Sequence, residues 1–271
     1  MMINGVTIEI CCGSVQDVVT ADAFPVDRME LNCALELGGL TPSLSSLVEA
    51  RVLTSKKIIC MVRPRPAGFC YSMLEWNTMT ADAKLFLEHG ADGIVFGCLN
   101  ADGSVDADRV SAMTRLVHSY GKEAVFHKAF DASRNLEESL QMLISCGVDR
   151  VLTSGGGVYP DLDLKRLAEL NRNYGTRIQI LPGGGVQPDN IRTLLAETGM
   201  HEVHLSAKMP AQDNGSYYAV HAGRLAETLA RLQPAASSSA RRDYITGEDA
   251  EMLENDPYEN SLDPYGTDHS L

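Results

Sequence analysis

Short apolar runs recur at regular intervals along the chain, and more polar segments with helical periodicity separate them. Eight such runs are rich in Ile, Val, Leu or Phe: Val6–Cys11, Arg28–Asn32, Ile58–Arg63, Gly93–Cys98, Glu123–Phe130, Arg150–Ser154, Ile178–Leu181 and Glu202–Ser206. Their length and composition are typical of buried strands in a parallel sheet. The pattern therefore predicts eight strand–helix units.

The segments between these runs carry residues that begin and end helices. Thr41 and Pro42 predict the N-cap and first position of a helix that continues over Ser43–Leu53. Asp106 is expected to cap a helix over Ala107–Tyr120, and Gly121 to end it. Other glycines follow helical stretches where a left-handed C-cap is expected, namely Gly90, Gly147, Gly175 and Gly199.

Eight units are the number that closes a (β/α)8 TIM barrel, a single α/β domain of about 250 residues. An open doubly wound sheet is the alternative. It ranks lower because the usual G-x-G-x-x-G is missing after the first strand, where Cys11-Cys12-Gly13-Ser14 stands instead. We expect the barrel to span residues 1–233.

The composition changes after this point. Residues 234–271 hold nine acidic side chains, two arginines and few aliphatic residues, which predicts a disordered acidic tail. The tail also contains Tyr244, Tyr258 and Tyr265. A docking peptide is therefore the alternative to a plain solvated tail.

The net charge and the cysteine content limit the classes of partner and the cellular location that we expect. The net charge of −13 over 271 residues argues against nucleic acid and anionic membrane surfaces as partners. No apolar run approaches the ~20 residues that span a bilayer, and the first residues lack the pattern of a signal peptide. Seven cysteines without a C-x-x-C pair indicate free thiols. We therefore expect a cytoplasmic protein.

Polar residues gather where the predicted strands end. In a barrel, these C-terminal ends and the loops after them build the functional face. One cavity is expected to hold two carboxylates, a guanidinium and two imidazoles, with a third carboxylate just beyond: Glu9, Glu30, Arg63, His127, His204 and Asp131. Such a set can bind a metal, bind an anion or move a proton. A salt-bridged network that fills the barrel is the alternative.

A glycine run follows the seventh predicted strand. Gly183, Gly184 and Gly185, together with Ser206 after the eighth strand, are candidate binding residues for an anionic ligand or cofactor group. Glycine lets backbone N–H groups approach a ligand, and many barrels hold phosphate in these two loops. The alternative is a tight turn that needs positive φ.

Three cysteines are candidate metal ligands. Cys11 and Cys12 are adjacent and point to opposite faces of a strand, and Cys33 ends the neighbouring strand. Cys33 with Cys11 or Cys12 is the best thiolate pair, and soft thiolates suit Cu(I). For each cysteine, the alternative is a small buried hydrophobic residue.

Six motifs in order, spread over Ile3 to Leu232, resemble the CutC family of copper homeostasis proteins. They are Gly38–Ser43, Met61–Arg65, Phe126–Asp131, Leu152–Gly155, Gly183–Gly185 and His204–Ser206. The family more often has arginine where this chain has Lys128. The resemblance implies a (β/α)8 barrel, a cytoplasmic location, a role in copper tolerance and homo-oligomers.

Two functions from different classes follow. The first is a copper-handling protein that binds Cu(I) through Cys11 or Cys12 with Cys33, and with Met61 or His127 nearby. The second is a barrel enzyme acting on a phosphorylated or otherwise anionic small molecule. There Arg63 and Gly183–Gly185 hold the anion, and His127, Glu9 or Glu30 does acid–base work. A third hypothesis is a scaffold whose acidic tail recruits partners.

Overall fold

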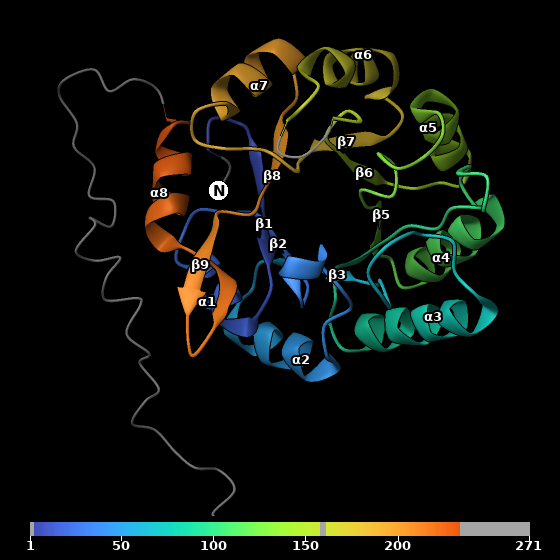
Figure 1. Cartoon of the computed structure of the whole chain (residues 1–271), viewed down its shortest axis with the longest axis horizontal. Helices are drawn as coiled ribbons and strands as arrows, with labels where there is room; N and C mark the ends of the chain where they lie inside the picture. The colour runs from blue at the N-terminus through green and yellow to red at the C-terminus, as the bar shows by residue number, and fades with distance from the viewer. Residues whose placement is uncertain (1–2, 158–160, 234–271) are drawn as a thin grey trace, which may run out of the picture. The chain divides into compact units, whose positions relative to one another are not determined.

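The chain folds as a TIM barrel, as the strand pattern predicts. The computed structural model describes residues 3–157 and 161–233. The eight barrel strands are β1 (Thr7–Cys12), β2 (Arg28–Leu31), β3 (Lys57–Met61), β4 (Gly93–Phe96), β5 (Glu123–Phe126), β6 (Arg150–Thr153), β7 (Gln179–Pro182) and β8 (Glu202–Leu205). The helices are α1 (Val15–Asp22), α2 (Leu44–Leu53), α3 (Met73–Glu88), α4 (Ala107–Ser119), α5 (Leu136–Ser145), α6 (Leu164–Tyr174), α7 (Ile191–Thr198) and α8 (Ala222–Ala230). Figure 1 shows the helices around the strands.

The strands form one parallel sheet in the order β7-β6-β5-β4-β3-β2-β1-β8. Among the described residues, no hydrogen-bonded ladder joins β7 to β8, so the barrel is nearly closed. At this seam Gly183 follows β7 and lies against His204 of β8. A Cβ atom on Gly183 would stand 2.9 Å from the Cβ of His204. Glycine therefore allows the two strand ends to approach.

The barrel interior has an apolar half and a charged half. Ile59, Met61, Val95 and Val125, from β3, β4 and β5, form a buried apolar cluster. On the other side, Glu9 pairs in register with both Arg28 of β2 and His204 of β8. Residues in register on parallel strands point to the same face, so these charged groups share the interior.

Ion pairs fill the lower part of the charged half. Arg28 donates from Nε to Glu9 and from Nη2 to Glu202 at 2.6 Å. Arg150 bridges Glu202 at 3.3 Å and Glu123 at 2.9 Å. Buried charges require such partners. Of the residues in the expected salt-bridged network, Glu9 and His204 form an ion pair, and the other partners in this layer are Arg28, Arg150, Glu123 and Glu202.

Two local predictions are wrong. The fifth strand ends at Phe126 and not at Phe130, because the chain turns at once: Phe130 N–H donates to the His127 carbonyl at 3.1 Å. The N-cap of α2 is Ser43, whose Oγ accepts from the N–H of Ser46. Thr41 instead accepts a hydrogen bond from the N–H of Arg63 at 2.9 Å. It therefore ties the start of this segment to the end of β3.

The predicted helix ends are mostly confirmed. Asp106 caps α4, and Gly90, Gly147 and Gly199 have positive φ. Gly175 does not, because it continues the right-handed turn at the end of α6 with φ −60°. The expected left-handed conformation of Gly175 is wrong.

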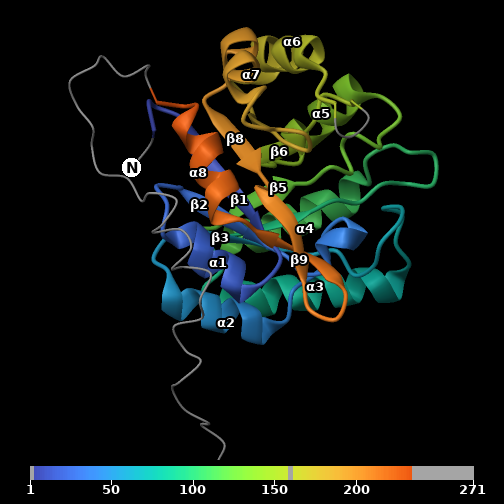
Figure 2. The same cartoon turned by 60° about the vertical axis from the view of Figure 1, so that its left-hand side comes forward.

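Two additions to the basic barrel stand at the C-terminal ends of the strands. A 3-10 helix, η1 (Leu35–Leu37), follows β2. An antiparallel hairpin of β9 (Lys208–Gln212) and β10 (Ser216–Val220) follows β8. Figure 2 shows β9 continuing beyond β8. Asn214-Gly215 lies in the turn, and this dipeptide is a strong sequence signal for a hairpin.

The remaining predictions concern segments or properties outside the barrel. The expected acidic tail, residues 234–271, lies outside the described residues. Within residues 3–157 and 161–233, none of the helices combines the length and the hydropathy needed to cross a membrane.

Candidate functional site

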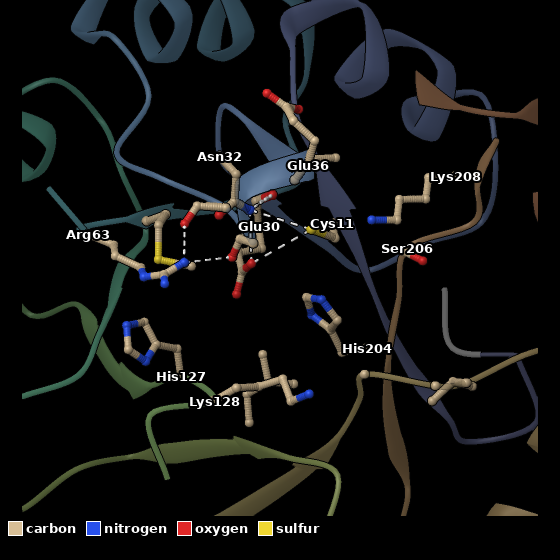
Figure 3. A pocket seen from close by; sticks show the side chains of 18 of the residues that line it. Cys11, Glu30, Asn32, Glu36, Arg63, His127, Lys128, His204, Ser206 and Lys208 are labelled. Carbon is tan, nitrogen blue, oxygen red and sulfur yellow. Dashed lines mark hydrogen bonds between the residues drawn. The ribbon is translucent and has the colours of Figure 1, made fainter. Parts of the chain in front are cut away.

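A cavity of about 420 Å³ opens among the C-terminal strand ends. Barrel strands and the loops that follow them contribute to it, and Figure 3 shows the side chains that meet there. Its lining includes Cys11, Glu30, Asn32, Glu36, Met61, Arg63, Phe69, His127, Lys128, Gly184, Gly185, Val186, His204, Ser206 and Lys208. The cavity lies at the face where barrels hold their ligands.

Three potential metal ligands converge on one side of this cavity. The ligand atoms of Cys11, Glu30 and His204 all lie within 4.8 Å of one another. The register explains this, because Cys11 pairs with Glu30 across β1 and β2, while β8 flanks β1 on its other side. In Figure 3 the three side chains point toward a common point. Sulfur, nitrogen and oxygen donors are therefore available together.

His204 is held in place by Glu9 beneath the cavity. Its Nδ1 donates to Glu9 Oε1 at 2.7 Å, which leaves Nε2 for the cavity side. Burial opposes the imidazolium, but the charges of Glu30 and Glu9 and the hydrogen bonds of Cys11 and Glu9 outweigh it and raise the pKa of His204 well above its ordinary value. His204 is therefore protonated at neutral pH. A carboxylate on the far nitrogen is the usual arrangement behind a metal-binding histidine.

The other two groups of the cluster resist ionisation. Burial raises the pKa of the Cys11 thiol, and Glu30 raises it further while His204 and Lys208 lower it. Burial also raises the pKa of Glu30. Asn32 Nδ2 donates to Glu30 Oε1 at 2.9 Å and lies 3.6 Å from Cys11 Sγ. Asn32 thus fixes the relative position of the carboxylate and the thiol.

The three predicted metal cysteines have different surroundings in the structure. Cys12 lies on the helix-facing side of β1, is fully buried, and its Sγ contacts the Ile10 carbonyl. Cys33 Sγ donates to the Thr41 carbonyl at 3.0 Å. Cys12 and Cys33 do not line the cavity, whereas Cys11 does. The geometry thus joins Cys11 to Glu30 and His204.

Arg63 lies on the opposite side of the cavity. Its Nη1 donates to the carbonyls of Gly38 and Gly39, both at 3.1 Å, and its Nη2 to the Ala67 carbonyl at 3.0 Å. Its guanidinium also stacks on Phe69, 5.2 Å from the ring centroid. Within the described part of the chain no carboxylate forms an ion pair with it, although its side chain is only 7% exposed. Its positive charge is therefore uncompensated.

His127 differs from His204 in charge. Its Nδ1 accepts a hydrogen bond from the N–H of Ala129 at 3.1 Å, so the neutral ring carries its proton on Nε2. That Nε2 has no hydrogen-bond partner in the described structure. Burial, and then the positive charge of Arg63, lower the pKa of His127 to about 3. His127 is therefore a neutral imidazole with one unused donor.

The glycine run borders the cavity as expected. Gly184, Gly185 and Ser206 line it, while Gly183 lies just below against His204 and Leu152. Gly184 and Gly185 have φ values of +84° and +157°, so the tight turn proposed as the alternative is also present. Lys128 reaches across from the turn after β5 to pack on Gly184.

Asp131 and Glu9 stand outside the cavity lining. Asp131 accepts hydrogen bonds from Ser154 N–H at 2.9 Å, from Ser154 Oγ at 2.8 Å and from the hydroxyl of Thr153. It thereby joins the turn after β5 to the end of β6. Glu9 lies one layer down, where Arg28 and His204 outweigh the effect of burial and hold its pKa well below the ordinary value.

Sequence reasoning did not select several of the polar lining residues as site residues. Asn32 ends the second predicted strand and Lys128 stands within the Phe126–Asp131 motif, but their places in the cavity wall emerge only from the fold. Glu36 and Lys208 come from η1 and the hairpin. The Asn214-Gly215 signal would have placed Lys208 in a strand next to the cavity.

Comparison with known proteins places this fold and site in context. The model of the CutC family matches residues 6–209. A family protein CutC of Treponema denticola is 44% identical over 206 residues, covering 75% of this chain and 82% of that protein. One from Bacteroides fragilis is 38% identical over 211 residues, covering 77% of this chain and 83% of its own length.

A solved structure agrees with these sequence matches. The crystal structure of the copper homeostasis protein CutC from Streptococcus agalactiae superposes with a TM-score of 0.69 at 28% identity. The match covers 73% of this chain and 97% of that one.

Proposed function

This chain belongs to the CutC copper homeostasis family, and we propose that it acts there by binding a copper ion directly at Cys11, Glu30 and His204. One observation carries this proposal: three ligand atoms of different softness lie within 4.8 Å of one another in a cavity. A thiolate and an imidazole nitrogen suit Cu(I), and the Glu30 carboxylate is the hardest of the three donors.

Proton release accompanies binding at this site. The pKa of Cys11 and that of His204 are both raised, so each group holds a proton that copper must displace. Metal ligands have to be deprotonated, and copper affinity should therefore increase as the pH rises. Glu9 would keep the His204 ring oriented after the exchange, because their hydrogen bond uses Nδ1.

The test is an anaerobic Cu(I) titration against a competing chelator. We expect Cys11→Ser to weaken binding by about 100-fold or more, and Glu9→Gln to weaken it by about 10- to 100-fold through loss of ring orientation. Cys33→Ser is the matched control, because Cys33 is also a partly exposed free thiol but does not line the cavity. Weak binding by the wild type, or equal losses in Cys11→Ser and Cys33→Ser, would contradict the proposal.

A barrel enzyme acting on an anionic small molecule is the second candidate function. The observation in its favour is that neutral His127 and the unpaired Arg63 line the same cavity. In that case His127→Ala and Arg63→Ala would abolish turnover, and Cys11→Ser would leave it intact. The copper proposal instead predicts that Cys11→Ser abolishes function and that His127→Ala and Arg63→Ala are tolerated.

We propose a cytoplasmic location and a homo-oligomeric state as well. Seven free cysteines support a reducing compartment. Val52 on α2 and Leu74 on α3 are 80% and 79% exposed, which supports a subunit contact at these helices. Sedimentation of the wild type and of Val52→Glu should show a larger species only in the wild type.

A further inference from the structure

The wall of the cavity opposite Cys11 carries a lysine that is packed on glycine. A Cβ atom on Gly184 would stand 2.5 Å from Lys128 Nζ, so only glycine leaves room for the ammonium there. Among the described residues this ammonium forms one ion pair, with Asp131 at 3.8 Å, and Asp131 already accepts hydrogen bonds from Thr153 and Ser154. Lys128 therefore retains most of its capacity to bind an anion.

Unused backbone donors lie beside this lysine. Among the described residues, none accepts a hydrogen bond from the N–H of Gly184, Gly185 or Val186, and all three residues line the cavity. Neighbouring N–H groups in a turn with positive φ form a concave site for oxyanions. Backbone donors left without partners at a cavity wall call for water or a ligand to satisfy them.

The charged side chains that line the cavity also favour an anionic ligand. Arginine and lysine contribute three cations to its lining, Arg63, Lys128 and Lys208, against the two carboxylates of Glu30 and Glu36, although the whole chain carries a charge of −13. The guanidinium of Arg63 is buried on carbonyl groups and has no carboxylate partner among the described residues. Cations that line a low-dielectric cleft attract anionic ligands to it.

We propose that this wall binds the oxyanion group of a small molecule, a phosphate ester or a carboxylate, through Lys128 and the N–H groups of Gly184–Val186. The cavity of about 420 Å³ exceeds the space of an ion, because one water molecule occupies roughly 30 Å³ of the liquid. Gly183 touches His204 and Gly184 touches Lys128, so the anion loop borders the proposed copper ligands. The molecule thus bridges the two walls shown in Figure 3.

This inference rests on the proposed function in one respect, namely that copper and the small molecule bind side by side. The anion wall itself uses none of Cys11, Glu30 or His204. Anion binding and copper binding can therefore fail separately. Joint binding should show as coupling, and couplings of about 5- to 150-fold are typical.

The first experiment is calorimetric titration of the metal-free protein with inorganic phosphate, and separately with acetate, at constant ionic strength. We expect one saturable site for at least one of the two anions. Phosphate alone would indicate a phosphorylated ligand, and acetate alone a carboxylate. Lys128→Gln should weaken binding by about tenfold or more, since a charge-assisted hydrogen bond is lost. Lys84→Gln is the matched control, because Lys84 is an exposed lysine on α3, 60% accessible.

Saturable binding of neither anion, or equal losses in Lys128→Gln and Lys84→Gln, would overturn the anion site. Repeating the titration with Cys11→Ser separates this site from the copper site. In the metal-free state this variant should bind the anion as the wild type does. Loading the wild type with Cu(I) should then tighten anion binding at least fivefold, and Cys11→Ser should lack this gain. Anion binding without any copper binding would uphold the anion wall and refute the copper function.

Discussion

His127 and His204 line the same cavity and are 3% and 8% exposed, but one ring is neutral and the other is protonated. Burial disfavours the imidazolium in both. At His127 the charge that acts with burial is the Arg63 cation, and the pKa decreases to about 3. At His204 the charges that oppose burial are Glu30 and Glu9, and the pKa increases. The charge of the neighbouring groups, and not the depth of burial, therefore decides the protonation state of these two histidines.

The two walls of the cavity differ in charge in the same way. The wall of β1, β2 and β8 contains acidic side chains in direct contact with groups that carry a proton. A metal ion can bind to these groups in place of their protons. The wall of β3, β5 and β7 contains the neutral imidazole of His127, Arg63 without a carboxylate partner among the described residues, Lys128 with one ion pair at 3.8 Å to Asp131, and backbone donors that no described residue accepts from. One wall suits a cation and the other an anion, so a single ligand class would use only half of the cavity.

Among these predictions, the largest expected effect is the loss of stability when Glu9 is removed. Glu9→Ala leaves Arg28 and His204 without their common partner in the barrel interior. Breaking a buried ion pair in this way costs about 3–5 kcal/mol, so we expect that loss in the free energy of unfolding by urea. Glu137→Ala removes an exposed pair with Arg166 and should cost less than about 1 kcal/mol. Equal losses would mean that the charged layer is not tightly coupled.

The pH dependence of stability should sharpen the difference between the histidines. The pKa of His127 is about 3 when folded and 6.5 in the reference state, so its unfolded form takes up a proton first. Its contribution to stability is full above pH 6.5 and is lost as the pH falls toward 3. Between pH 6 and 4 the wild type should therefore lose up to about 1.4 kcal/mol per pH unit more than His127→Gln.

The control for this profile is His201→Gln, because the side chain of His201 is exposed. This variant should follow the wild-type slope in urea denaturation at each pH. A wild type and a His127→Gln variant with the same slope would show that His127 is protonated in the folded protein. His204 should act in the opposite direction, since its stabilising proton is lost only as the pH rises above 6.5 through the raised pKa.

The smallest expected effect concerns Lys208. Its charge lowers the pKa of Cys11, although burial keeps that pKa above the ordinary value. Lys208→Gln should therefore slow the alkylation of Cys11 by iodoacetamide at pH 8 by about twofold, measured by mass spectrometry of the modified peptide. Cys70 is exposed and serves as the reference thiol within the same molecule. An unchanged rate at Cys11 would show that Lys208 does not act on the thiol.

The sequence predicted the eight barrel strands, although not the hairpin, and it predicted which residues of β1, β2 and β8 face inward, because alternation along a strand follows directly from strand geometry. It placed Glu9 and Cys11 on one face correctly. It could not place Glu9 below the cavity and Cys11 within it, because that depth depends on the register between strands. The cysteine pairing was argued from chemical softness and from the adjacency of the first two strands, whereas the register pairs Cys11 with Glu30.

The position of Asp131 shows a second limit of sequence reasoning. Its spacing from His127 suggested a shared strand face, but the chain turns after Phe126 and directs the carboxylate to Ser154. The position of Lys128 over Gly184 arises from the same turn. A turn that begins inside an apolar run gives no periodic signal, so these directions emerge only from the fold.

The seam between β7 and β8 has a mechanical consequence. Ladder hydrogen bonds join all the neighbouring barrel strands except β7 and β8, which no ladder joins in the described chain. The loop with Gly184 follows β7, whereas His204 lies on β8, so the two walls of the cavity meet at the seam. Among the described residues this seam is therefore closed by close packing, as between Gly183 and His204, and not by a hydrogen-bonded ladder. Substitutions at Gly183 should consequently affect both walls of the cavity at once.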